Sequence, residues 1–230
     1  MIEPESLNIN ITDNDSVSAR LYAAPRGRSA GVTFIFAHGA GADQLSGFMQ
    51  QYAQGLAERG LDVLTFNFLY KEQHKSAPDP KAKLELCYRK VIEAALANKK
   101  LKKNRLVIGG KSMGGRIASQ VAAALADDGD PLANKIDGLV FLGYPLHPPG
   151  NPEKLRTEHL KNLQIPMLFI QGTRDSLGTP DEIRPFIKKL KAKIHIIEGG
   201  DHSFKVPKRG ELTQQQVHDT AMDEIVSWAK

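Results

Sequence analysis

The sequence predicts an α/β fold, a mostly parallel sheet of eight strands with helices on both faces. Three observations support this fold class. Continuous apolar runs such as Val32–Ala37 are typical of strands that a parallel sheet buries on both faces. Amphipathic segments of helical spacing separate most of these runs, as crossovers between parallel strands require. A hairpin with alternating apolar and polar residues comes first and adds an antiparallel edge.

The hairpin combines Leu7–Ile11 with Val17–Tyr22, and Asp13–Asp15 supplies turn residues between them. Six further strands follow, most of them short apolar runs that end at a turn signal. We expect these strands at Val32–Ala37, Asp62–Phe68, Arg105–Gly109, Gly138–Gly143, Met167–Gln171 and Lys193–Ile197.

Helices are expected at Ser46–Glu58, Pro80–Asn98, Met113–Ala126, Lys154–Leu163 and Asp181–Leu190. Gly60 is suited to end the first of them. Thr213 and Gln216 have the spacing of a capping box for a final helix. The buried face of that helix is expected to comprise Val217, Ala221, Ile225 and Trp228.

The composition is that of an ordinary globular protein, with 230 residues, 41% hydrophobic and 25% charged. We expect a single domain over residues 1–230. No apolar run approaches the length of a membrane span, and the first residues lack the basic and apolar regions of a signal peptide. The single cysteine, Cys87, excludes an internal disulfide, and its helical spacing from apolar residues indicates a buried structural role. The sequence therefore predicts a cytoplasmic protein with no membrane partner.

The net charge of +5 is modest. Lysines cluster at Lys99–Lys103 and Lys188–Lys193, near the ends of predicted helices, where cations suit the helix dipole. Neither cluster has the aromatic residues or the recognisable module of a nucleic-acid-binding face. We predict that both are solvated surface and that the protein has no nucleic-acid partner.

The strongest chemical signal lies in Leu106–Arg116, where an apolar strand runs into two pairs of glycines around Ser112. Residues 110–114, Gly-Lys-Ser-Met-Gly, fit the G-x-S-x-G nucleophile elbow. The glycines allow a strand and a helix to meet closely around a strained serine. A phosphate-binding loop would need glycine where the chain has Arg105. An α/β turn with an idle serine is the remaining alternative.

Eight strands with such an elbow after the fifth resemble the α/β-hydrolase fold. In that fold an acid and a histidine follow the serine, each in a loop after a later strand. Asp175 and His202 stand in such loops here. The resemblance implies that Ser112 is the nucleophile, that His202 is the general base and acid, and that Asp175 fixes the histidine tautomer.

Other candidates fit these roles less well. Asp201 adjoins His202 and would have to fold back sharply, and Asp181 lies at an expected helix start, where capping explains it. His38 ends a strand in a His-Gly motif, and in this fold such a histidine usually braces the loop. The default role for the other histidines is structural; these are His74, His147, His159, His195 and His218.

The oxyanion of the tetrahedral intermediate needs two preorganised donors. The N–H of Met113, at the start of the helix after the elbow, is expected to be one of them. By resemblance to His-Gly-x loops of the fold, the N–H of Ala40 in His38–Gly41 is the other. We expect no cofactor and no metal ion.

Four segments resemble the family of testis-expressed protein 30 and its bacterial relatives, near the dienelactone-hydrolase-like group. They are residues 36–41, 66–68, 109–116 and 199–204. The same segments resemble the hydrolase-like domain of a chromatin-complex scaffold subunit. Dienelactone hydrolases proper use a cysteine nucleophile, so Ser112 points to serine-ester chemistry instead.

The resemblance implies a serine hydrolase that cleaves a small carboxylic ester, thioester or amide through an acyl-enzyme. A catalytically silent binding or scaffold protein of the same fold is the alternative. Residues 144–166 are too few for a helical cap, so the site should be shallow and open, and His147, Asn67 and Tyr70 belong to its rim or to loop structure. Lys111 and Arg116 flank the serine and suit an anionic substrate, and Arg116 equally suits an ion pair that braces a loop. The oligomeric state does not follow from the sequence.

Overall fold

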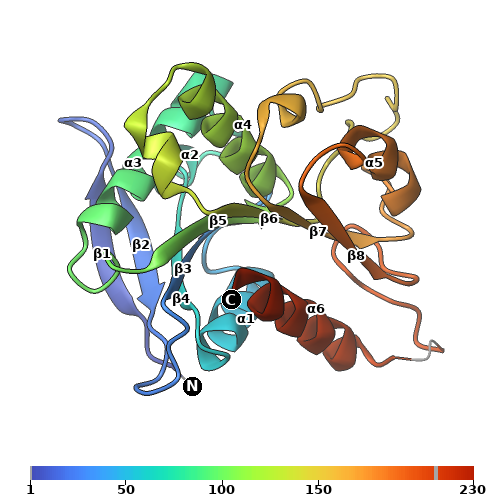
Figure 1. The fold of residues 1–230 in the computed structure, drawn as a ribbon, viewed down its shortest axis with the longest axis horizontal. Helices are drawn as coiled ribbons and strands as arrows, with labels where there is room; N and C mark the ends of the chain where they lie inside the picture. The colour runs from blue at the N-terminus through green and yellow to red at the C-terminus, as the bar shows by residue number, and fades with distance from the viewer. Residues whose placement is uncertain (1, 210–211) are drawn as a thin grey trace.

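The computed structural model describes residues 2–209 and 212–230. Its centre is one eight-stranded sheet in the order β1-β2-β4-β3-β5-β6-β7-β8 (Figure 1). The strands are β1 (Glu5–Asn10), β2 (Ser16–Tyr22), β3 (Val32–Ala37), β4 (Asp62–Phe66), β5 (Arg105–Lys111), β6 (Gly138–Leu142), β7 (Met167–Gly172) and β8 (Ala192–Ile197). Strand β2 is antiparallel to β1 and to β4, and the remaining pairs are parallel. The predicted fold class is confirmed.

Helices cover both faces of this sheet (Figure 1). One face carries α1 (Gly47–Glu58) and α6 (Gln214–Ala229), and the other carries α3 (Lys81–Ala97), α4 (Met113–Asp127) and α5 (Pro180–Ile187). Each face buries its own apolar cluster, because side chains of a strand alternate between the two faces. Within the part of the chain that the structure describes, no helix is long and apolar enough to cross a membrane.

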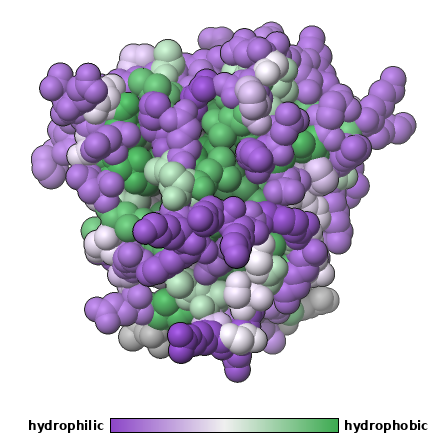
Figure 2. All heavy atoms as spheres, turned by 60° about the vertical axis from the view of Figure 1, so that its left-hand side comes forward, coloured by the Kyte–Doolittle hydropathy of each residue, from purple (hydrophilic) through white to green (hydrophobic). Residues whose placement is uncertain are grey.

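The amino-terminal hairpin forms as predicted and extends the sheet beyond β4. Val17, Ala19 and Leu21 of β2 are buried, whereas most of β1 is exposed. Figure 2 brings this side forward and shows apolar patches between polar side chains. A shallow pocket there lies between β1 and α3, with Leu7 and Ala94 in its lining.

The predicted helix at Lys154–Leu163 is wrong. Only a 3-10 turn, η2 (Leu160–Asn162), forms in this segment. The backbone of Arg156 is engaged elsewhere, since its N–H donates to the Leu146 carbonyl (2.8 Å) and its carbonyl accepts from the Tyr144 hydroxyl (2.6 Å). A helix through Arg156 would lose both hydrogen bonds.

Smaller differences concern element ends. Strand β4 stops at Phe66, and a short helix that the sequence did not predict, α2 (Leu69–Glu72), follows. Strand β5 continues to Lys111 instead of ending at Gly109. The N-cap of α5 is Thr179, in a capping box with Glu182, so Asp181 is not the cap. The capping box that begins α6 forms as predicted, although Trp228 of this helix is only partly buried.

Candidate active site

Ser112 occupies a strained corner between β5 and α4. Its φ of 51° and ψ of −115° lie outside the regions that residues with a side chain usually adopt. A Cβ at Gly114 would lie 2.7 Å from the His38 carbonyl oxygen, and one at Gly110 would lie 2.8 Å from the backbone of Gly114. Both glycines are therefore needed for α4 to approach the ends of β3 and β5 so closely.

The structure brings the side chains of Ser112, His202 and Asp175 into one chain of hydrogen bonds. Ser112 Oγ lies 2.8 Å from His202 Nε2, and His202 Nδ1 lies 2.8 Å from Asp175 Oδ2. The carboxylate can only accept, so Nδ1 carries the proton and Nε2 is free to accept one from the serine. The imidazole remains 25% exposed, whereas the carboxylate is fully buried.

Asp175 has two further donors. The backbone N–H of Leu177 donates to Oδ1 (2.8 Å), and Nε2 of Gln171 donates to Oδ2 (2.8 Å). Gln171 is fully buried at the end of β7 and also contacts the backbone of Tyr144 and Gly178. It thus joins the loops after β6 and β7. Sequence reasoning missed Gln171, since a lone glutamine in an apolar strand carries no spacing signal.

The two rival carboxylates serve other purposes. Oδ1 of Asp201 accepts from the N–H groups of Ser203 and Lys205 (2.8 and 2.9 Å), which makes it a brace of the turn that carries His202. Asp181 is exposed in the first turn of α5 and lies 3.6 Å from Arg184. Neither aspartate contacts the His202 ring.

His38 orients the loop after β3. It is fully buried, and burial lowers the pKa of its imidazole to about 4, so the ring is neutral at pH 7. Nε2 accepts from the N–H of Phe68 (3.1 Å), and Nδ1 therefore donates to the Gly39 carbonyl (2.8 Å). In the trans peptide that follows, the N–H of Ala40 points away from His38. The expected bracing role of His38 is thus seen in its contacts.

The same loop packs against the corner. A Cβ on Gly39 would lie 3.6 Å from Ser112 Cβ, so its backbone passes directly beside the serine. The Ala40 carbonyl accepts from the Tyr70 hydroxyl (2.8 Å), while no acceptor within the described residues takes the Ala40 N–H. Met113 supplies the first N–H of α4, which has no acceptor within its own helix. Two amide donors thus stand on elements adjoining Ser112.

A second serine–histidine contact lies on the same helix. Ser119 Oγ is 2.8 Å from His159 Nε2, a contact that the sequence did not indicate. Ser119 is fully buried and donates to the Arg116 carbonyl (2.8 Å). Burial, with the positive charges of Arg116 and Lys81, lowers the pKa of His159 to about 4. No carboxylate among the described residues contacts this imidazole.

The remaining candidates act in loop structure. Nδ1 of His147 lies 3.0 Å from the Pro148 carbonyl, and Asn67 Oδ1 accepts from the N–H of Gln44 (2.9 Å). Cys87 is buried, and burial raises the pKa of its thiol to about 12, which fits a structural role. In residues 2–209 and 212–230, no three His, Cys, Asp or Glu side chains gather as a metal site would require.

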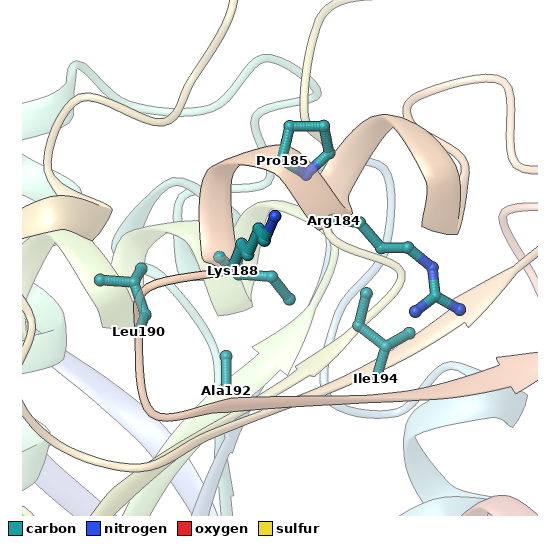
Figure 3. A pocket seen from close by; sticks show the side chains of 7 residues that line it. Arg184, Pro185, Lys188, Leu190, Ala192 and Ile194 are labelled. Carbon is teal, nitrogen blue, oxygen red and sulfur yellow. The ribbon is translucent and has the colours of Figure 1, made fainter.

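The two cations beside the serine differ. Arg116 forms no ion pair with a described residue; Nη1 lies 3.3 Å from Gln120 Oε1, and Nε is buried without a partner. Lys111 instead directs its ammonium to the main chain of His202, 2.6 Å from the carbonyl oxygen. The pocket between α5 and β8 in Figure 3 contains neither cation, and no site residue lines it.

A sheet of this order, with a serine at a strained strand-to-helix corner after the fifth strand, defines an α/β hydrolase. Residues 30–230 match the family model of the alpha/beta hydrolase domain, and the chain belongs to this family.

Solved structures agree on the fold over nearly the whole chain. A dienelactone hydrolase from Anabaena variabilis has a TM-score of 0.75 and 18% identity, covering 100% of this chain and 99% of that one. An alpha-beta serine hydrolase homologue from Coxiella burnetii has a TM-score of 0.73 and 17% identity, covering 100% and 99%. A serine hydrolase without a lid from Xanthomonas campestris has a TM-score of 0.71 and 18% identity, covering 99% and 95%. At these identities the likeness is one of fold.

Proposed function

We propose that this chain is a serine hydrolase that cleaves a small carboxylic ester through an acyl-enzyme, with thioesters and amides as related substrates. The hydrogen-bond chain of Ser112, His202 and Asp175 carries the proposal, because it ends on a serine held in a strained conformation. A binding protein has no physical need for that strain.

In the first half-reaction, Ser112 Oγ attacks the carbonyl carbon of the ester while His202 Nε2 takes the hydroxyl proton. The N–H groups of Ala40 and Met113 stabilise the oxyanion that develops on the carbonyl oxygen. Collapse of this intermediate breaks the ester bond, and the imidazolium returns its proton to the departing alkoxide. An acyl group is left on Ser112.

In the second half-reaction, His202 removes a proton from water as the water oxygen attacks the acyl-enzyme. Collapse of this second intermediate breaks the bond between the acyl carbon and Ser112 Oγ, releases the carboxylic acid and returns the proton from the imidazolium to Ser112. Asp175 stabilises the imidazolium in both halves and keeps the tautomer that leaves Nε2 free. Gln171 and the N–H of Leu177 hold the carboxylate in place.

Residues 144–166 form only the 3-10 turn η2 and no helical cap, which favours a small substrate, or one end of a longer one. Xanthomonas campestris has a hydrolase of this fold that is described as lidless, which supports the comparison. The proposal treats residues 1–230 as one domain, since a single sheet takes strands from both halves of the chain.

The test is labelling of the purified protein with a fluorescent fluorophosphonate, which phosphonylates an activated serine. We expect wild-type protein to be labelled and Ser112→Ala to show no label. His202→Ala and Asp175→Asn should be labelled at least about a hundredfold more slowly, because each removes part of the proton path.

Circular dichroism and thermal melting serve as the control that each variant folds. If folded wild-type protein is not labelled, the esterase proposal fails and a catalytically silent binding or scaffold protein takes its place. Labelling that persists in Ser112→Ala would show that another residue reacts.

A further inference from the structure

Lys111 lies immediately before Ser112, at the end of β5, and its side chain reaches the loop that carries His202. The ammonium donates to the His202 carbonyl at 2.6 Å. The two segments that carry Ser112 and His202 therefore make two contacts. Ser112 Oγ lies 2.8 Å from His202 Nε2, and the adjacent Lys111 donates to the His202 carbonyl. The second contact involves only the main chain of the histidine.

The ammonium lies among residues of α1, of the His202 loop itself and of the segment after β6. It lies 5.7 Å from the ring centre of Phe48 in α1 and 5.6 Å from that of Phe204 in the loop after β8, both within reach of a cation–π interaction. A Cβ on Gly143, after β6, would lie 2.9 Å from Nζ and 3.1 Å from the His202 oxygen. Gly143 thus leaves room for the contact.

The turn that carries His202 is rigid within itself. Phe204 has a φ of 64°, and its N–H donates to the Asp201 carbonyl (2.9 Å). The Asp201 side chain accepts from Ser203 and Lys205. These hydrogen bonds hold the turn in one shape. Asp175 holds the imidazole at Nδ1, and the Lys111 contact ties the main chain of the same turn to β5.

Placing an ammonium here has a cost in burial, and a hydrocarbon chain would avoid that cost but make no hydrogen bond to the His202 carbonyl. Burial lowers the pKa of the Lys111 ammonium to about 8, and the negative charges of Asp175 and Asp201 only partly oppose this effect. The imidazole of His202 is also close, since a Cβ on Gly143 would lie 2.9 Å from Lys111 Nζ and 3.3 Å from a ring carbon of His202. Phe48 of α1, which also faces the ammonium, carries no charge. Methionine would fill the same space without burying a charge.

We propose that Lys111 is a positioning residue for the hydrolase reaction, whose ammonium ties the turn of His202 to the strand that carries Ser112. This inference rests on the proposed function. Since a hydrogen bond from a charged donor is about twice as strong as one from a neutral donor, loss of the proton above pH 8 loosens the turn.

The experiment compares wild type with Lys111→Met and Lys111→Arg, using the fluorophosphonate and p-nitrophenyl acetate as probes between pH 6 and 10. In Lys111→Met we expect kcat and the labelling rate at pH 7 to fall about tenfold, within the range that misplacement of a catalytic group costs. KM should change less than about twofold, because the contact lies on the base and not on the substrate. The melting temperature should not fall.

The pH profile is the readout that a merely structural role would not move. Wild-type kcat should decline above pH 8, and this decline should be absent in both variants, since methionine does not titrate and arginine keeps its charge. Lys111→Arg should recover part of the activity that Lys111→Met loses. Hydrogen exchange of the amides at residues 203–205 should be faster in Lys111→Met than in wild type.

Lys71→Met is the matched control, because Lys71 also stands over an aromatic ring, that of Tyr70 at 5.3 Å, without contacting the His202 turn. It should leave kcat and exchange unchanged. Wild-type rates and exchange in Lys111→Met would overturn the inference alone. A Lys111→Met protein that unfolds, with Lys111→Arg equally inactive, would assign Lys111 a structural role instead. Wild-type protein without any label would overturn the proposed function and this inference together.

Discussion

The molecule contains two serine–histidine pairs with the same 2.8 Å separation, Ser112–His202 and Ser119–His159. Both serines belong to the elbow and the helix that follows it. The two pairs differ in the other hydrogen-bond partners of the serine and of the histidine. Asp175 accepts from Nδ1 of His202, so the Nε2 atom facing Ser112 is an acceptor.

In the second pair, the hydroxyl proton of Ser119 goes to the Arg116 carbonyl at 2.8 Å. His159 Nε2 must then be the donor in its contact with Ser119, so it cannot take the proton of that serine. Ser119 also sits in the regular interior of α4, whereas Ser112 has a positive φ. A short distance between serine and histidine is therefore not sufficient for activation; the next partner of each group decides the direction of the proton.

The largest effect should separate the two serines. Ser112→Ala is expected to lower hydrolysis of p-nitrophenyl acetate by at least about a thousandfold, because no other group can form the acyl-enzyme. Ser119→Ala should stay within about twofold of wild type and cost about 1 kcal/mol of stability through the lost hydrogen bond. Steady-state rates and urea unfolding of both variants check this. Equal losses of activity in the two variants would contradict the proposal that only Ser112 is activated by its histidine.

A second test removes the support of the carboxylate. Gln171→Leu deprives Asp175 of one donor and leaves the buried backbone groups of Tyr144 and Gly178 without partners. We expect a loss of about 2 kcal/mol in stability, as for a buried polar group left unsatisfied, and about a tenfold lower kcat.

Gln120→Leu is the matched control for Gln171→Leu, since Gln120 is partly exposed on α4 and its side chain hydrogen-bonds only Arg116 among the described residues. It should change neither quantity by more than experimental error. Wild-type kcat in Gln171→Leu would show that Asp175 does not need its amide donor.

A third test adds a methyl group at the corner between β5 and α4, and its expected effect is on stability. Gly114→Ala places a methyl group 2.7 Å from the His38 carbonyl oxygen, so α4 has to move away from the loop after β3. We expect the free energy of unfolding to fall by about 1–3 kcal/mol, as overpacking usually costs. Gly47→Ala, where a Cβ meets no atom within 4 Å, should not destabilise the protein. Denaturant titrations measure the free energy of unfolding of both variants. Equal losses in the two would show that the close approach at Gly114 is not the cause.

The smallest effect concerns acid stability and His159 of the Ser119–His159 pair. The pKa of His159 is lowered to about 4 in the folded protein, against 6.5 ordinarily, and that of His38 is lowered likewise. Between pH 6.5 and 4 the unfolded chain therefore binds more protons, so stability falls as the pH falls through this window. In His159→Gln, the free energy of unfolding from urea titrations at pH 7, 6 and 5 should depend less on pH than in wild type. His74→Asn, at an exposed histidine, should keep the pH dependence of wild type. If stability depended on pH in the same way in all three proteins, His159 would not be a source of the acid sensitivity.

Most of the fold could be predicted from the sequence because its strands are continuous apolar runs with turn residues at their ends. The same regularity placed Asp175 and His202, since each follows a strand whose carboxyl end must reach the edge that carries Ser112. The contacts among these three side chains are those that the predicted triad requires.

What escaped prediction depends on contacts between segments far apart in the chain. The Lys154–Leu163 segment has helical spacing, yet Tyr144 and Leu146 take the backbone of Arg156. The contact of Lys111 with the His202 carbonyl joins residues 91 positions apart, so no local pattern indicates it. The positive φ of Phe204 escaped prediction as well, since Phe204 is not a glycine.

The hairpin has a practical consequence for anyone who produces the protein. The family match begins at residue 30, yet β1 and β2 lie before it and supply two of the eight strands. Residues 19–22 pair with residues 63–66 of β4. A chain trimmed to the family boundary would expose Val63, Leu64 and Phe66 along an unpaired edge, which invites edge-to-edge aggregation between copies. Expression should therefore begin ahead of Glu5, and poor solubility of a trimmed chain would say nothing about the intact fold.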